Sequence, residues 1–175
     1  AQDYNPEWLV GASTQVDTNT FGRFYDRDQW QHAFGVTTSA ARVDPSTHGY
    51  YALYQWFTGT SPYADQTIEN FMPSFAYLFS AIQSAGPNLT PESLATAFGG
   101  LSTPQGISHP YYRWGDNKVW QDPDYSGIED AAFFFWDSKA TGQDEMRRDG
   151  IGMMQFPTNG KRYMPGEWTS EDILF

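Results

Sequence analysis

Short apolar runs, each bounded by glycine, proline or polar turn residues, mark the predicted strands of the chain. The first run covers 7–11 and ends in a polar turn at 12–15. A second run covers 34–38, and two further runs lie at 131–136 and 152–156. Runs of this length between turn-forming residues are typical of buried strands, so the pattern predicts strands near both ends of the chain.

Apolar residues at intervals of three and four predict the helices, which fill most of the chain between these strands. The spacing predicts a helix over 17–33, a second over 44–57 that Gly59 closes, and a third from 65 to the Gly86-Pro87 pair. A fourth is expected over 90–98, where Thr90 offers an N-cap hydroxyl and proline occupies the first helical position. The pattern is that of an α/β chain whose last part is richer in strands and loops.

The charge of the chain narrows the range of partners that it can bind. Its 175 residues carry 10 Lys and Arg against 21 Asp and Glu, a formal net charge of -11 at pH 7. A surface this acidic repels phosphate backbones and anionic lipids, so nucleic acid is not an expected partner. No apolar run approaches the roughly 20 residues of a membrane span, and none is expected. The absence of cysteine excludes disulfides and thiolate chemistry.

One segment has the spacing of the first half of a calcium-binding loop. Oxygen-bearing side chains stand at its positions 1, 3, 5 and 9: Asp122, Asp124, Ser126 and Asp130. Gly127 fits position 6, but position 12, which supplies a bidentate carboxylate in such loops, is Phe133. Pro123 also lies inside the segment. These departures favour a solvated turn before a strand and leave calcium as the weaker alternative.

The sequence contains no motif that assigns a catalytic activity. Its histidines stand far apart, and it has no nucleophile elbow, phosphate-binding loop or dinucleotide-binding glycine run. A non-enzymatic protein without a cofactor is therefore expected. Six aromatic residues could instead form a sugar-stacking platform: Tyr111, Tyr112, Trp114, Trp120, Tyr125 and Trp136. They indicate, as an alternative function, a secreted glycan-binding or surface-interaction module, unless they are core and loop anchors.

Three segments carry a resemblance to a known family. They are Trp8-Leu9-Val10-Gly11 with its polar turn, the run 33–38, and the stretch 71–86, which ends in an Ala-Ile-x-x-Ala-Gly phrase before 89–94. In this order they resemble the C-terminal half of type I periplasmic substrate-binding proteins, the branched-chain amino acid (Leu/Ile/Val) family of ABC-transporter receptors. The resemblance covers nearly the whole chain, although each motif is degenerate.

The resemblance implies a non-catalytic, two-lobed receptor whose Rossmann-like lobes close on a small, partly apolar solute. It assigns 1–40 to the end of one lobe and a crossing strand, 41–110 to the helical part of the other lobe, and 111–175 to final strands and an aromatic-rich tail. It also implies an ABC permease as partner, an extracytoplasmic (periplasmic, cell-surface or secreted) location, and an N-terminal half that is missing here. That half would lie in the same chain or in a second one.

The resemblance also places six candidate ligand-binding residues: Ser13, Thr14, Gln15, Asp17, Phe71 and Met72. In amino-acid-binding members the turn after the first strand carries an acidic group for the ligand ammonium. That group is lost here unless Asp17 replaces it, which argues for a neutral or carboxylate ligand. Phe71 and Met72 begin the matching inter-lobe helix and suggest an apolar wall. Ordinary loop and core packing is the alternative for these residues.

Overall fold

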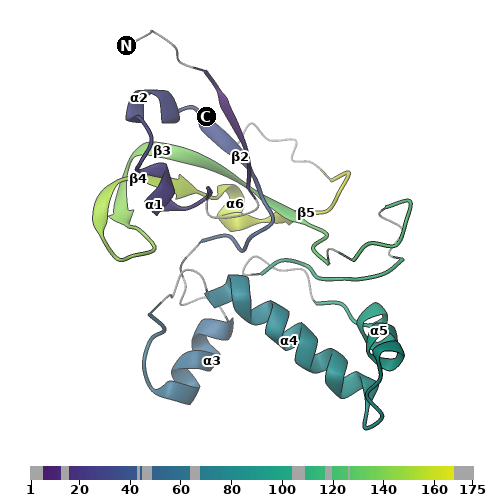
Figure 1. The fold of residues 1–175 in the computed structure, drawn as a ribbon. Coiled ribbons are helices and arrows are strands. Elements are labelled where there is room, and N and C mark those ends of the chain that lie inside the picture. The colour runs from purple at the N-terminus through teal and green to yellow at the C-terminus, as the bar shows by residue number, and fades with distance from the viewer. Residues whose placement is uncertain are drawn as a thin grey trace.

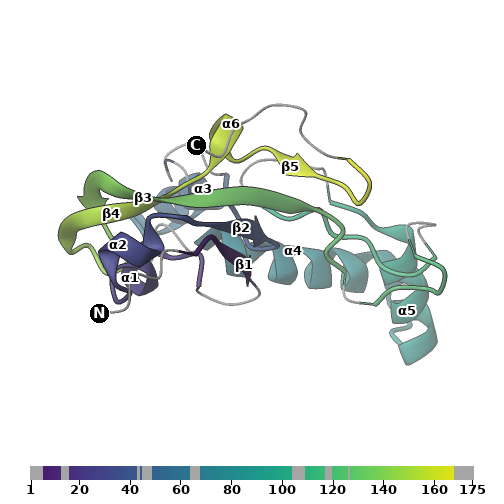
Figure 2. The same ribbon diagram turned by 90° about the horizontal axis from the view of Figure 1, so that it is seen from above.

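A sheet and a group of helices form two layers of the molecule (Figure 1). The computed structural model describes residues 6–12, 16–42, 44, 49–63, 68–103, 109–116, 120–125 and 127–167. Figures 1 and 2 both place α5 (Pro91–Gly100), the last helix of the helical layer, at the end of the molecule opposite to the hairpin of β3 (Ala131–Gln143) and β4 (Asp149–Gln155). The fold is mixed α/β.

The sheet has strands of mixed orientation. β1 (Trp8–Ala12) runs parallel to β2 (Ala33–Thr37), and β2 pairs antiparallel with the long strand β3 (Ala131–Gln143). β4 (Asp149–Gln155) and the two-residue β5 (Arg162–Tyr163) both pair antiparallel with β3. The strand order is β1-β2-β3-β4, so strands from both ends of the chain share one open sheet.

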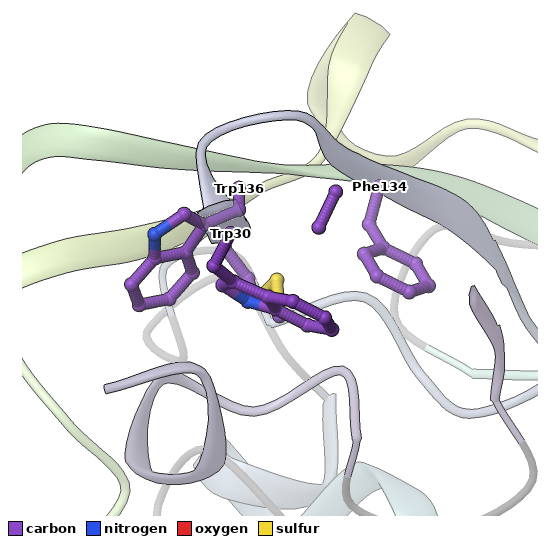
Figure 3. Packing of buried hydrophobic residues seen from close by; sticks show 5 residues of the cluster. Trp30, Phe134 and Trp136 are labelled. Atoms are coloured by element: carbon purple, nitrogen blue, oxygen red, sulfur yellow. The ribbon is translucent and has the colours of Figure 1, made fainter. Parts of the chain in front are cut away.

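The core lies on one face of this sheet, as the strand alternation requires. It contains Trp30, Ala33, Phe134, Trp136 and Met154, which Figure 3 shows from close by. Trp136 is packed so tightly that a Cβ added at Gly22 or at Gly152 would collide with its indole ring.

The predicted helix over 17–33 is wrong, because two short helices occupy this region. α1 (Asn19–Gly22) and α2 (Arg27–Trp30) are separated by residues 23–26, of which the last, Asp26, has extended backbone. The Asp26 carboxylate accepts the N–H groups of Asp28 and Gln29, both at 3.1 Å. This N-cap starts a new helix and breaks the continuous pattern that the aromatic spacing suggested.

The other predicted helices are present. α3 (Gly49–Thr58) ends before Gly59, whose φ of 73° suits glycine at this position. α4 (Ile68–Ala85) continues through Pro73, which is buried inside the helix, and α5 (Pro91–Gly100) begins at the Thr90 cap. Among the described residues, no helix is long and apolar enough to cross a membrane.

The C-terminal strands are longer and more numerous than the apolar runs predicted. β3 extends to Gln143 through a register shift between Asp137 and Thr141, where the Asp137 carboxylate accepts two backbone N–H groups. α6 (Pro157–Gly160) and β5 follow β4, and neither was predicted. Residues 158 and 159 have positive φ, so α6 is a tight turn that leads the chain back along β3.

Candidate functional site

The connection from the sheet to the helices begins after β2 with residues 38–42, which are called the junction below. The chain leaves the sheet here at the end of β2 and enters the helical layer (Figure 1). The N–H of Ala40 donates to Oδ1 of Asn70 on α4 at 2.6 Å. Ala40 and Ala41 are almost fully buried, at 1% exposure each. The junction therefore carries contacts to both layers.

A buried ion pair holds the C-terminal end of the junction, at Arg42. Arg42 lies 2.9 Å from Oδ2 of Asp17, which is 0% exposed, and donates to the Asp17 carbonyl at 3.0 Å. The hydroxyl of Thr37 donates to the same carboxylate oxygen at 2.6 Å. Glu145 adds a second carboxylate at 3.8 Å from Arg42 and caps the start of α1. A buried pair of this kind depends on such additional hydrogen bonds.

A second buried ion pair supports the N-terminal end of the junction, at Thr38 and Ser39. Nε of Arg162 on β5 lies 2.9 Å from Oδ1 of Asp130. The same guanidinium donates to the carbonyl oxygens of Thr38 and Ser39, at 3.1 and 2.7 Å. Burial lowers the pKa of Arg162, and the charge of Asp130 opposes that shift. The pair fixes β5 and the junction to each other.

The start of the helical layer contains a further buried charge. Glu69 of α4 is 1% exposed, and its carboxylate accepts the N–H of Tyr50 at 2.9 Å. It therefore caps the first turn of α3, where a negative charge is favoured by the helix dipole. Burial raises the pKa of Glu69, while the N–H groups of Tyr50 and Tyr51 and the charge of His109 oppose the shift.

The six predicted ligand-binding residues lie at different places in the chain. Ser13, Thr14 and Gln15 lie outside the described residues. Asp17 is engaged with Arg42 in the buried pair at the junction. Phe71, 65% exposed, and the half-buried Met72 follow Asn70, the residue of α4 that binds the junction. Asp17 and Asn70 thus each contact the junction, at Arg42 and at Ala40.

The candidate calcium ligands do not converge among the described residues. Asp122 is exposed, and the backbone of Asp124 pairs with Gly115. Ser126 lies outside the described part of the chain. The carboxylate of Asp130 accepts from Arg162 and from the N–H of Tyr111. Within the described ranges, no group of three His, Cys, Asp or Glu side chains is arranged to hold a metal ion.

The six aromatic residues of the proposed sugar platform differ in their exposure. Tyr112 and Trp136 are buried, and Trp114 stacks on Phe98 of α5 with ring centroids 4.5 Å apart. Of the six, Trp120 and Tyr125 are exposed, at 54% and 73%. At least half of the set therefore contributes to packing.

Sequence reasoning missed Arg42, Asn70 and Arg162, which bind at the junction, and Glu69, which caps α3. Glu69 gave a signal, since it is the only charged residue within the apolar helical pattern of 68–85. Comparison with protein-family models, with curated proteins and with solved structures finds no match to this chain. Its function is therefore inferred from the arrangement of its own residues.

Proposed function

We propose that the chain is part of a two-lobed, non-catalytic solute receptor that delivers a small, partly apolar solute to an ABC permease outside the cytoplasm. The observation that carries the proposal is the path of the chain. It leaves the sheet at β2, forms the helical layer, and returns to the sheet at β3, directly beside β2. Such a crossing between two bodies is what a receptor with Rossmann-like lobes of the type I periplasmic-binding class requires.

The exposed apolar surface of α3 and α4 supports the proposal that a further N-terminal half packs against this chain. α3 has no buried residue, and Trp56 and Phe57 are each 81% exposed. Phe71, Phe75 and Phe79 follow one face of α4 at intervals of four residues and are all exposed. Exposed apolar patches of this kind mark interaction surfaces. We infer that an N-terminal half, in the same chain or in a second one, covers this surface.

The contacts of Asp17 bear on the kind of solute. Its carboxylate is fully buried and its charge is already matched by Arg42. A solute ammonium would have to compete with a guanidinium for this carboxylate. The proposed solute is therefore neutral or a carboxylate, with an apolar body against Phe71 and Met72 and hydrogen bonds from Ser13, Thr14 and Gln15.

The mass of the natively isolated protein tests the proposed architecture. Mass spectrometry under denaturing conditions is expected to give about twice the 19.8 kDa of this chain if the missing half is continuous with it. A denatured mass of 19.8 kDa within a heavier native complex would place that half in a second chain. A single mass of 19.8 kDa under both conditions would contradict the two-lobed receptor.

A solute panel tests the proposed site on the same isolated protein. We expect 4-methylpentanoate to raise the melting temperature more than leucine, which has the same body and an additional ammonium, because bound ligand stabilises the fold by mass action. Phe71→Ala should weaken this effect. Phe79→Ala is a matched control, since both side chains are 65% exposed on α4. Equal effects of the two substitutions, or stabilisation by oligosaccharides alone, would contradict the proposal.

A further inference from the structure

The strand β1 forms one edge of the sheet, with β2 as its neighbour on one side (Figure 2). The N–H of Trp8 donates to the carbonyl of His32, just before β2, at 3.2 Å. Because backbone groups alternate in direction along a strand, the N–H and C=O groups of Leu9 and Gly11 point away from β2. No residue in the described part of the chain forms a hydrogen bond with these outward groups.

The opposite edge of the sheet, β4, is covered instead. The N–H of Met154 donates to Oδ1 of Asn19 on α1 at 2.6 Å, and the Gly152 carbonyl accepts from Arg23 at 3.1 Å. Proteins protect edge strands by such cover, or with charged residues, proline or a bulge. β1 contains no charged residue and no proline, and its register with β2 is continuous. Its outer edge is therefore suited to pairing with a further strand.

We propose that β1 pairs antiparallel with β1 of a second copy of this chain, about a two-fold axis at Val10. Centring the pair on Val10 places Leu9 of each copy opposite Gly11 of the other. The outward N–H and C=O groups of these two residues then face each other, and each such pair exchanges both of its hydrogen bonds. A two-fold contact needs only one surface, which both copies carry.

The side chains of β1 favour this register. Leu9 is 77% exposed, and a Cβ added at Gly11 would meet nothing within 4 Å, so the open space at Gly11 can receive Leu9 of the second copy. On the other face, the rings of Trp8 and Trp30 have centroids 6.3 Å apart, and Val10 packs against the core. Antiparallel pairing would therefore extend the apolar core face from one copy to the next.

The pairing is expected to be weak and to depend on protein concentration and salt. β1 has five residues and offers a small interface. Each copy has a net charge of -11, so the two copies repel each other at low ionic strength. The contact is separate from the exposed rings of α3, and nothing argued about β1 rests on the proposed solute receptor.

Cysteine cross-linking tests the register directly, because the 1–175 chain has no cysteine of its own. Val10→Cys should form a disulfide-linked dimer under air with catalytic copper phenanthroline, since residues opposite each other at this kind of position have Cα atoms about 4.5 Å apart. Leu9→Cys is the matched control. Position 9 is the more exposed, but its two copies lie two residues out of register and beyond the roughly 7 Å that a disulfide spans.

We expect Val10→Cys to cross-link about tenfold faster than Leu9→Cys. Random collision, or association through α3, would favour the more exposed position, so equal or faster cross-linking of Leu9→Cys would overturn the proposal. Absence of a Val10→Cys dimer from the folded variant would overturn it too. Should Val10→Cys fail to fold, an equal mixture of Leu9→Cys and Gly11→Cys chains decides. The mixed dimer should then exceed either symmetric dimer well beyond a statistical distribution, and a statistical distribution would overturn the pairing.

Discussion

At Gly127, the absence of a side chain leaves room for the indole of Trp114, which stacks on Phe98 of α5. A Cβ added here would collide with the indole of Trp114, and the residue also has a φ of 82°. Gly127→Ala should therefore destabilise the fold by about 2–4 kcal/mol, combining steric overpacking with left-handed backbone strain. Urea unfolding of the chain measures this difference.

Gly86→Ala separates the two causes. Gly86 has a similar φ of 76°, but a Cβ there would meet nothing within 4 Å. The control should cost only the strain, about 1–2 kcal/mol. If both substitutions destabilised the fold equally, the collision with Trp114 would contribute nothing.

Glu69 makes the stability of the helical layer depend on pH. Because the pKa of this buried carboxyl is raised in the folded state, protonation favours folding. The stabilising contribution is fully present below the ordinary pKa of glutamate and is lost as the pH rises through the raised folded value. Glu69→Gln cannot ionise, so the free energy of unfolding of the variant minus that of the unaltered chain should be more positive at about pH 7.5 than at about pH 4.

Urea unfolding at the two pH values measures this difference. Glu7→Gln, at an exposed carboxylate, is the control and should change the unfolding free energy little at either pH. A difference for Glu69→Gln that is the same at both pH values would show that ionisation of this group does not act on folding.

Among the elements, α5 is defined by the most local signals. The hydroxyl of Thr90 accepts the N–H of Ser93, and the Ser93 hydroxyl accepts the N–H of Thr90, which completes a capping box. Thr90→Ala should destabilise the fold by about 1 kcal/mol. Thr96→Ala, within the same helix, should be neutral or slightly stabilising, because alanine has the higher helix propensity. Thermal unfolding compares the two, and an equal loss at both positions would argue against the cap.

The elements that the sequence predicted well are those with local start and stop signals. Gly59, Thr90 and the Gly86-Pro87 pair fix helix ends through their own backbone preferences, and these predictions are confirmed. The region 17–33 failed because the Asp26 cap outweighs the aromatic spacing. β5 has two residues and forms only because β3 is beside it, so no local pattern could predict it.

The candidate site was less predictable than the helices for the same reason. The family resemblance made Asp17 a candidate, but its partner Arg42 lies beyond β2 and becomes a neighbour only when the sheet forms. Arg162 and Asp130 are 32 residues apart and meet through the pairing of β3 with β5. Contacts of this kind depend on strand register, which a single sequence does not specify.

For the molecule as a whole, the distribution of charge matters more than its total. The chain carries a net charge of -11, yet residues 49–63 contain no charged residue. The acidic residues therefore protect the other surfaces from association by repulsion, whereas the exposed rings of α3 receive no such protection. An apolar surface without charge is expected to pair with any available apolar partner, including a second copy of the chain.

This distribution predicts that the 1–175 chain associates when it is produced alone, and that α3 causes the association. Trp56→Glu combined with Phe57→Glu should shift the chain towards monomer in sedimentation velocity, with little loss of stability, since both side chains are 81% exposed. Phe24→Glu combined with Tyr125→Glu adds the same charge at rings that are 71% and 73% exposed elsewhere, and should leave the association in place. Monomeric behaviour of the unaltered chain, or an equal effect of both double variants, would contradict this account, because general charge repulsion would then outweigh the local apolar surface.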